Sequence, residues 1–224
     1  MTDRRNEVRH IGNMRPVEGS SLDEQAAFDP SRPFRGKGAA FLDRDGVIND
    51  QTAFVNKPDD FRLLPGAAAA IRRLNEVQVP VVVVTNQGGI ALGYLTEADL
   101  TAIHDRMAEL LAKERAHVDK IYFCPHYPAG TIPEYTKECP DRKPGIGMLE
   151  RARKELGIDL ARSFLVGDAT TDILAGLRAG CTTILVHTGQ AGTDGKEVAE
   201  PDFTVKDLPA AVHLILDHLA GAAT

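Results

Sequence analysis

The sequence predicts one α/β domain in which helices cover both faces of a central parallel β-sheet. From residue 38 onward, short apolar runs alternate with stretches that have the apolar spacing of amphipathic helices. The apolar runs are continuous, as in the four valines at residues 81–84, which is typical of strands buried on both faces. The chain has 224 residues, enough for one such domain with a sizeable core. Strands separated by crossover helices therefore predict three layers, helix, sheet and helix.

Five strands and five helices are predicted. The strands are the apolar runs at residues 38–42, 81–84, 120–123, 163–166 and 183–186. The helices are the stretches at residues 67–77, 96–114, 145–156, 171–179 and 208–219. Two helix starts have local signals: Pro65 and Gly66 precede the first helix, and T-E-A-D from Thr96 resembles a capping box with Asp99 in the usual Glu place.

Residues 1–37 differ in character from the rest of the chain. They mix Arg, Asp, Glu, Ser, Pro and Gly without apolar periodicity. We interpret them as an N-terminal extension, either disordered or lying over a domain that spans residues 38–224.

Composition and charge narrow the range of partners and locations. The net charge is −6 at pH 7 and no basic stripe is present, so nucleic acid is not an expected partner. The chain has no run of 18 apolar residues, and its opening segment lacks the apolar core of a secretory signal. We therefore expect a cytoplasmic monomer without membrane contact, whose three cysteines form no disulfide framework.

Polar or reactive side chains stand where four of the predicted strands end. They are Asp43, Thr85, Cys124 and Asp168. In open parallel sheets, ligands bind outside the carboxyl ends of the strands. The sequence therefore predicts a functional site at this edge of the sheet.

The strongest signal is F-L-D-R-D-G-V-I-N at residues 41–49. A turn through Arg44 can bring the carboxylates of Asp43 and Asp45 into one pocket. Paired carboxylates bind a hard divalent cation, and one can act as nucleophile while its neighbour transfers a proton. Surface turns also favour Asp and Gly, so this pattern gains its meaning from the motifs that follow it.

Three further motifs follow later strands. The hydroxyl of Thr85 suits a phosphate oxygen, and Arg142 and Lys143 supply a bidentate fork and a compact positive charge for an anion. In G-D-A-T-T-D, Asp168 and Asp172 lie one helical turn apart, which places both carboxylates on one face. A helix cap is the alternative interpretation of Asp172.

In their order and placement, these motifs resemble the four signature motifs of the haloacid-dehalogenase (HAD) superfamily of phosphotransferases, over nearly all of residues 38–187. The resemblance implies a Rossmann-like fold, with Asp43 as nucleophile and Asp45 as general acid and base. It implies Mg²⁺ held by Asp43, the backbone carbonyl of Asp45, and Asp168. The residues implied on the phosphate and substrate are Thr85, Asn86, Gln87, Arg142 and Lys143.

Electrostatics explains why such chemistry requires a cation. A carboxylate that attacks a phosphate dianion meets two like charges, each costing about 4 kcal/mol at about 4 Å with an effective dielectric of about 20. Together these pairs would slow the step by about six orders of magnitude. Mg²⁺ and Lys143 must offset most of this repulsion.

The interval between Asp43 and Thr85 has room for one helix and no large cap domain. A second insertion, residues 124–141, contains Cys124-x-His126 and Cys139-x-Asp141. We predict a structural zinc loop here, with these four residues as candidate ligands. The loop has little apolar content, so a metal would stabilise it; a reduced cysteine pair beside a surface histidine is the alternative.

This loop, with D-R-D-G-V-I-N and V-V-T-N-Q-x-G-I, resembles the D-glycero-D-manno-heptose 1,7-bisphosphate 7-phosphatase family. Related histidinol-phosphate phosphatases have a similar but shorter loop. Three positions depart from the family pattern. Asp141 stands where the last zinc ligand is usually Cys, Leu92 where Arg is frequent, and Ala169 where Lys is frequent.

The sequence thus predicts a Mg²⁺-dependent phosphomonoester hydrolase that acts on a small phosphorylated metabolite, with the heptose bisphosphate as the favoured substrate. Histidinol phosphate or a broader range of sugar phosphates is the alternative. A phospho-ligand-binding protein without turnover would not need Asp45, and a phosphomutase would need a closing cap. His104, in the middle of a predicted helix, is expected to be a packing or surface histidine.

Overall fold

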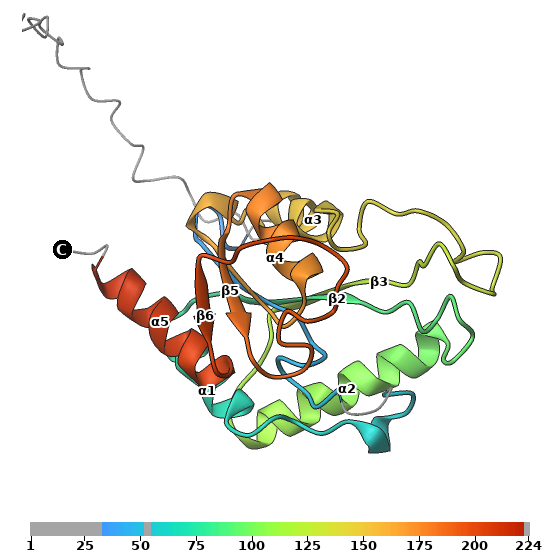
Figure 1. Cartoon of the computed structure of the whole chain (residues 1–224). Helices are drawn as coiled ribbons and strands as arrows, with labels where there is room; N and C mark the ends of the chain where they lie inside the picture. The colour runs from blue at the N-terminus through green and yellow to red at the C-terminus, as the bar shows by residue number, and fades with distance from the viewer. Residues whose placement is uncertain (1–32, 52–54, 222–224) are drawn as a thin grey trace, which may run out of the picture.

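The computed structural model describes residues 33–51 and 55–221 of the chain. Its centre is a six-stranded sheet in the order β3-β2-β1-β4-β5-β6, in which every neighbouring pair is parallel (Figure 1). The strands are β1 (Ala40–Leu42), β2 (Val81–Asn86), β3 (Lys120–Cys124), β4 (Phe164–Gly167), β5 (Thr182–Val186) and β6 (Phe203–Val205). The predicted α/β class with a parallel sheet is confirmed.

Helices cover both faces of this sheet. They are α1 (Ala67–Glu76), α2 (Glu97–Lys113), α3 (Gly147–Leu156), α4 (Thr170–Ala179) and α5 (Leu208–Gly221), with short 3₁₀ helices η1 (Pro58–Asp60) and η2 (Leu160–Arg162). Figure 1 shows α3 and α4 above the sheet and α1, α2 and α5 below it. The three predicted layers are therefore present.

Strand β1 shows why the strand sequences are continuously apolar. Phe41 packs into the core on the α3 side, whereas Ala40 and Leu42 pack into the core under α1, α2 and α5. All three side chains are fully buried. Because both faces of the strand are covered, no position favours a polar residue until the strand ends at Asp43.

The predicted elements are all present, with ends shifted by a few residues. The capping box of α2 is complete: Thr96 N donates to Asp99 Oδ2 at 2.8 Å, and Asp99 N donates to Thr96 Oγ1 at 3.1 Å. One strand, β6, was not predicted. It has three residues at the sheet edge, and Phe203 is 39% exposed, so it lacks a continuous buried run.

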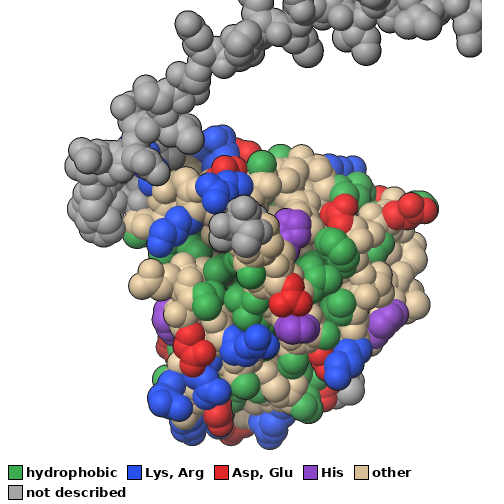
Figure 2. Space-filling view, turned by 90° about the vertical axis from the view of Figure 1, so that its left-hand side faces the viewer, with side chains coloured by type: hydrophobic (Ala, Val, Ile, Leu, Met, Phe, Trp, Pro, Cys, Tyr) green, Lys and Arg blue, Asp and Glu red, His purple; other side chains and the backbone are tan. Residues whose placement is uncertain are grey.

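Most of the predicted N-terminal extension lies outside the described residues. Its last part lies against the end of α3, where Phe34 N donates to Leu156 O at 3.0 Å and Gly36 N donates to Gly157 O at 2.9 Å. Among the described residues, no helix combines the length and apolar character needed to cross a bilayer. Figure 2 shows the side that is on the left in Figure 1, where acidic and basic side chains are interspersed.

Candidate active site

A cavity of about 520 Å³ lies at the carboxyl ends of the central strands. Parallel strands end at the same edge of the sheet, so residues far apart in sequence meet there. The predicted catalytic and phosphate-binding residues all line this cavity, namely Asp43, Asp45, Thr85, Asn86, Gln87, Arg142, Lys143 and Asp168. Leu92 and Ala169, two of the positions that depart from the family pattern, line it as well.

Asp43 follows β1 directly and is 9% exposed. Its Oδ1 accepts hydrogen bonds from Arg44 N at 2.7 Å and Lys143 Nζ at 3.0 Å. No other described residue donates to this carboxylate, so the lone pairs of Oδ2 are available. Burial raises the pKa of Asp43 to about 7, although the charge of Lys143 opposes the shift. This carboxylate is placed to act as a nucleophile or metal ligand.

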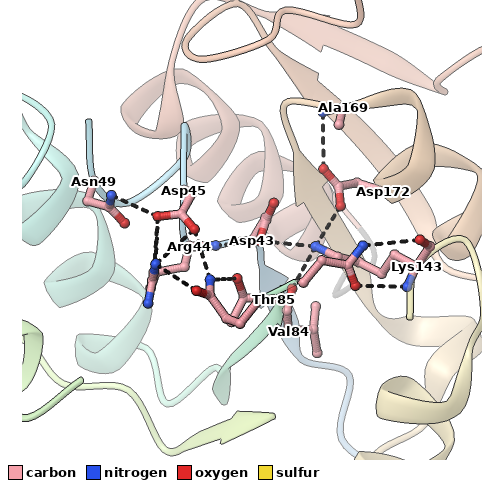
Figure 3. A network of polar contacts seen from close by, with 11 residues as sticks. Asp43, Arg44, Asp45, Asn49, Val84, Thr85, Lys143, Ala169 and Asp172 are labelled. Carbon is pink, nitrogen blue, oxygen red and sulfur yellow. Dashed lines mark hydrogen bonds and ion pairs between the residues drawn. The ribbon is translucent and has the colours of Figure 1, made fainter. Parts of the chain in front are cut away.

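Lys143 is buried and supplies the positive charge next to Asp43. Its Nζ contacts three acceptors: Val84 O at 2.7 Å, Asp43 Oδ1 at 3.0 Å and Asp172 Oδ1 at 2.6 Å (Figure 3). Burial alone would lower the pKa of Lys143, but the two aspartates outweigh it and raise the pKa. Asn86 holds this segment at the sheet, since its side chain bonds both Lys143 N and Lys143 O.

Three buried aspartates form an acidic cluster in the cavity. Asp43, Asp168 and Asp172 each offer a carboxylate oxygen, and these oxygens lie within 4.8 Å of one another. With Lys143 as their partner, two negative charges are in excess. Burial, followed by the charges of the other two aspartates, raises the pKa of Asp168 to about 8. A cluster of hard oxygen ligands with excess negative charge suits Mg²⁺, so the residues present fit the predicted ion.

Two glycines, Gly46 and Gly189, leave the space that the side chain of Asp168 occupies. A Cβ added at Gly46 would lie 2.3 Å from Asp168 Oδ2, and one added at Gly189 would lie 2.1 Å from the same atom. The same oxygen accepts a hydrogen bond from Gln190 N at 2.6 Å. The D-x-D-G glycine is therefore needed for the close approach of two chain regions.

Asp172 was not among the predicted metal or phosphate residues, yet it has two functions here. Its Oδ2 accepts from Ala169 N at 3.1 Å, which caps α4, and its Oδ1 pairs with Lys143. Both interpretations of the sequence are therefore combined in one residue. Its position four residues after Asp168 was the signal for a place in the site.

Asp45 lies on the side of Asp43 that is opposite to Lys143 and Asp172 (Figure 3). Its carboxylate accepts hydrogen bonds from Arg44 Nη2 at 2.9 Å, Asn49 Nδ2 at 3.0 Å and Gln87 Nε2 at 2.9 Å. Burial would raise the pKa of Asp45, but the charge of Arg44 and these hydrogen bonds together lower it. Without a substrate, Asp45 is therefore ionised, and three donors fix the orientation of its carboxylate.

Thr85 is the last but one residue of β2 and is 1% exposed. Its Oγ1 accepts from Gln87 Nε2 at 2.8 Å, so its own hydroxyl proton is available to a ligand. The amides of Asn86 and Gln87, by contrast, bond mainly to Lys143, Asp45 and Thr85. These two side chains order other site residues, and the ligand contact predicted for them stays a prediction.

Three of the four predicted zinc ligands come together. One ligand atom each of Cys124, His126 and Cys139 lies within 4.8 Å of the others, and Cys124 Sγ is 3.8 Å from His126 Nδ1. Asp141 is outside this group because its Oδ2 pairs with Arg151 Nη1 of α3 at 3.2 Å. The prediction of Asp141 as the fourth ligand therefore does not match the geometry.

Several cavity residues had no motif in the sequence. Tyr127, Gln190 and Lys196 line the cavity from the loops after β3 and β5. Arg142 lies 4.7 Å from the Tyr127 ring centroid and donates to His126 O at 3.1 Å, so the cysteine loop also shapes the cavity. Glycines after β5, at the carboxyl end of a parallel strand, were an available signal for Gln190.

Comparison with known proteins agrees with this geometry. Residues 141–211 match the HAD-hydrolase-like family model. The chain is 42% identical to a D-glycero-beta-D-manno-heptose-1,7-bisphosphate 7-phosphatase from Yersinia pestis, over 78% of this chain and 94% of the relative. It is 40% identical to a D-glycero-alpha-D-manno-heptose-1,7-bisphosphate 7-phosphatase from Photorhabdus laumondii, over 71% of this chain and 88% of the relative.

A solved structure is similar over most of the chain. It is the D,D-heptose 1,7-bisphosphate phosphatase of B. bronchiseptica, in complex with magnesium and phosphate. Its TM-score is 0.73 at 38% sequence identity, covering 81% of this chain and 99% of that one. The predicted family is confirmed: the chain belongs to the D-glycero-D-manno-heptose 1,7-bisphosphate 7-phosphatases of the HAD superfamily.

Proposed function

We propose that this chain is a Mg²⁺-dependent phosphatase that removes the 7-phosphate of D-glycero-D-manno-heptose 1,7-bisphosphate through a phospho-aspartyl intermediate on Asp43. The observation that carries the chemistry is the buried group of Asp43, Lys143, Asp168 and Asp172, with Asp45 beside it. Family membership supports the phosphatase class and the substrate.

The chain's own residues supply a nucleophile and a proton carrier. Asp43 attacks phosphorus, forming an acyl phosphate as the bond to the sugar oxygen breaks. Asp45, which is ionised without a substrate, takes up a proton as the substrate binds and gives it to that leaving oxygen. It then takes a proton from the water that cleaves the acyl phosphate and releases inorganic phosphate. When bound, Mg²⁺ would be held by Asp43, Asp168 and the Asp45 carbonyl, next to Asp172, and would offset the repulsion between carboxylate and phosphate.

A bisphosphate needs cationic contacts for its second phosphate as well. Leu92 and Ala169 supply none, but Arg142 and Lys196 line the same cavity. Arg142 is held in place by its contacts with Tyr127 and His126. The cavity volume of about 520 Å³ is in the range of small-molecule sites. These features support a doubly anionic sugar as the substrate.

A substrate panel tests this proposal. Purified protein with Mg²⁺ is given both anomers of the heptose 1,7-bisphosphate, histidinol phosphate and fructose 1,6-bisphosphate, and phosphorus NMR identifies the product. We expect kcat/KM to be highest for a heptose bisphosphate, with heptose 1-phosphate as the product. Equal kcat/KM values across the panel would contradict the narrow substrate, and bound phosphate without turnover would favour a binding protein instead.

We propose in addition that Cys124, His126 and Cys139 hold a structural Zn²⁺ with three side chains. Two thiolates and an imidazole are a usual part of zinc sites, and the group is already clustered. Elemental analysis of the purified protein is expected to give about one zinc per chain in the wild type and in Asp141→Ala, and none in Cys139→Ser. Loss of zinc in Asp141→Ala would show that Asp141 is a ligand.

A monomeric state and a cytoplasmic location stay predictions from the sequence. Light scattering on the purified protein tests the monomeric state. Fractionation of cells that make the protein tests the cytoplasmic location.

A further inference from the structure

Arg44 is a buried cation between the two site aspartates. It is 1% exposed, and its guanidinium Nη2 contacts Asp45 and, at 3.2 Å, Gln87 Oε1. Its other terminal nitrogen, Nη1, lies 3.3 Å from Nε2 of His104, which comes from the middle of α2. The sequence interpretation of His104 as a packing or surface residue does not include this contact.

The chemistry of the contact fixes the state of the imidazole. A guanidinium is always charged and can only donate, so Nε2 of His104 must accept. The proton of the neutral ring is then on Nδ1. Burial, followed by the charge of Arg44, lowers the pKa of His104 to about 4, which keeps the ring neutral at physiological pH. His104 also packs edge-on against Phe123, with ring centroids 6.1 Å apart.

We infer that His104 is a positioning residue of the active site, which acts through Arg44 to orient the carboxylate of Asp45. This inference rests on the proposed role of Asp45 as proton carrier. Arg44 is long and flexible, and a buried guanidinium keeps one orientation only where acceptors meet it in several directions. Within the described part of the chain, His104 is the acceptor for Nη1.

Loss of this acceptor is expected to change the orientation of the Asp45 carboxylate, although His104 itself does not contact the substrate. The guanidinium would turn to find a new acceptor, and its bonds to both oxygens of Asp45 would be lost or lengthened. A small misplacement of a catalytic group lowers the rate by up to about a hundredfold. The effect is therefore expected in kcat, whereas KM changes little.

Two variants separate positioning from packing. His104→Leu keeps the apolar volume but has no acceptor, and His104→Gln places an amide oxygen near the original Nε2. We expect kcat to fall at least about tenfold in His104→Leu and to return to within about threefold in His104→Gln. Phe123→Leu, which removes the ring contact and keeps the acceptor, is the matched control. If kcat in all three variants simply follows their melting temperatures, the inference is overturned.

A spectroscopic measurement does not depend on turnover. Nitrogen NMR of ¹⁵N-histidine-labelled full-length protein, with His104→Gln to assign the signal, reports which ring nitrogen carries the proton. We expect the neutral Nδ1–H form from about pH 5 to pH 8. A proton on Nε2, or titration near the ordinary value of about 6.5, would overturn the inference. If the wild type hydrolyses no substrate while the Nδ1–H form is found, the proposed function fails and the Arg44 contact stands.

Discussion

Replacing Asp43 with Asn removes one negative charge from a buried group that has two in excess. The amide is nearly the same size but cannot form an acyl phosphate, so phosphate release should be lost. At the same time, the metal-free protein should become more stable. The reason is that the pKa of Asp43, about 7 against an ordinary 3.8, records the cost of ionising it in the fold.

The size of the effect follows from this pKa. At about 1.4 kcal/mol per pKa unit, the ionised carboxyl costs up to about 4 kcal/mol above pH 7. Asparagine retains only part of the interaction with Lys143, so we expect a net gain of about 2 kcal/mol at pH 8. For a domain of this length, that gain raises the melting temperature by about 4–8 °C.

The stability difference between Asp43→Asn and the wild type depends on pH. The folded state holds the Asp43 proton more tightly than the unfolded state, so wild-type stability falls as pH rises from about 4 to about 7. Asparagine has no such loss. The advantage of Asp43→Asn should therefore be small near pH 4, grow up to pH 7 and remain constant above it.

Thermal unfolding in EDTA, from pH 4 to pH 8, measures this difference. Asp105→Asn is the matched control, because Asp105 is exposed and its replacement should change stability by less than about 0.5 kcal/mol. The reasoning is refuted if Asp43→Asn is less stable than the wild type at pH 8, or if the difference is the same at every pH.

Three further predictions concern the same site. Lys143→Met leaves the buried carboxylates around it unpaired, so urea unfolding should show a loss of about 3–5 kcal/mol, and an unchanged midpoint would argue against the ion pairs. In the same urea assay, Gly46→Ala should lower the free energy of unfolding by about 1–3 kcal/mol more than Gly36→Ala. Both glycines have positive φ, but only at Gly46 would the new Cβ meet Asp168. Mg²⁺ should raise the melting temperature more at pH 8 than at pH 6, because protons on Asp43 and Asp168 compete with it; equal shifts would exclude these ligands.

The sequence predicts most of the fold because buried strands need continuous apolar runs. Val81 to Val84 alternate between the two cores and leave no ambiguity about burial. Strand β6 has no such signal, since it is short and half-exposed at the sheet edge. The site motifs were also predictable, because the parallel topology brings every strand end to the same edge.

What the sequence could not give are contacts between side chains from distant segments. The pairing of His104 with Arg44 joins α2 to the loop after β1. Arg44 stands in the D-R-D-G motif and His104 inside a helix, and neither position predicts the contact. Asp141 has the spacing of a zinc ligand, but Arg151 on α3 competes for its carboxylate. Such choices depend on which partners meet in space, and a linear pattern does not contain that information.

The central claim is that the carboxylate of Asp43 becomes phosphorylated during turnover. Protein mixed with Mg²⁺ and the heptose bisphosphate can be quenched in acid, reduced with borohydride, and mapped by peptide mass spectrometry. Reduction converts a phosphorylated aspartyl group into homoserine. We predict homoserine at position 43 only when both the substrate and Mg²⁺ are present. The control is Asp45→Asn protein without substrate, which should contain no homoserine at this position. Phosphate release at full rate with position 43 unmodified at every quench time would contradict the account.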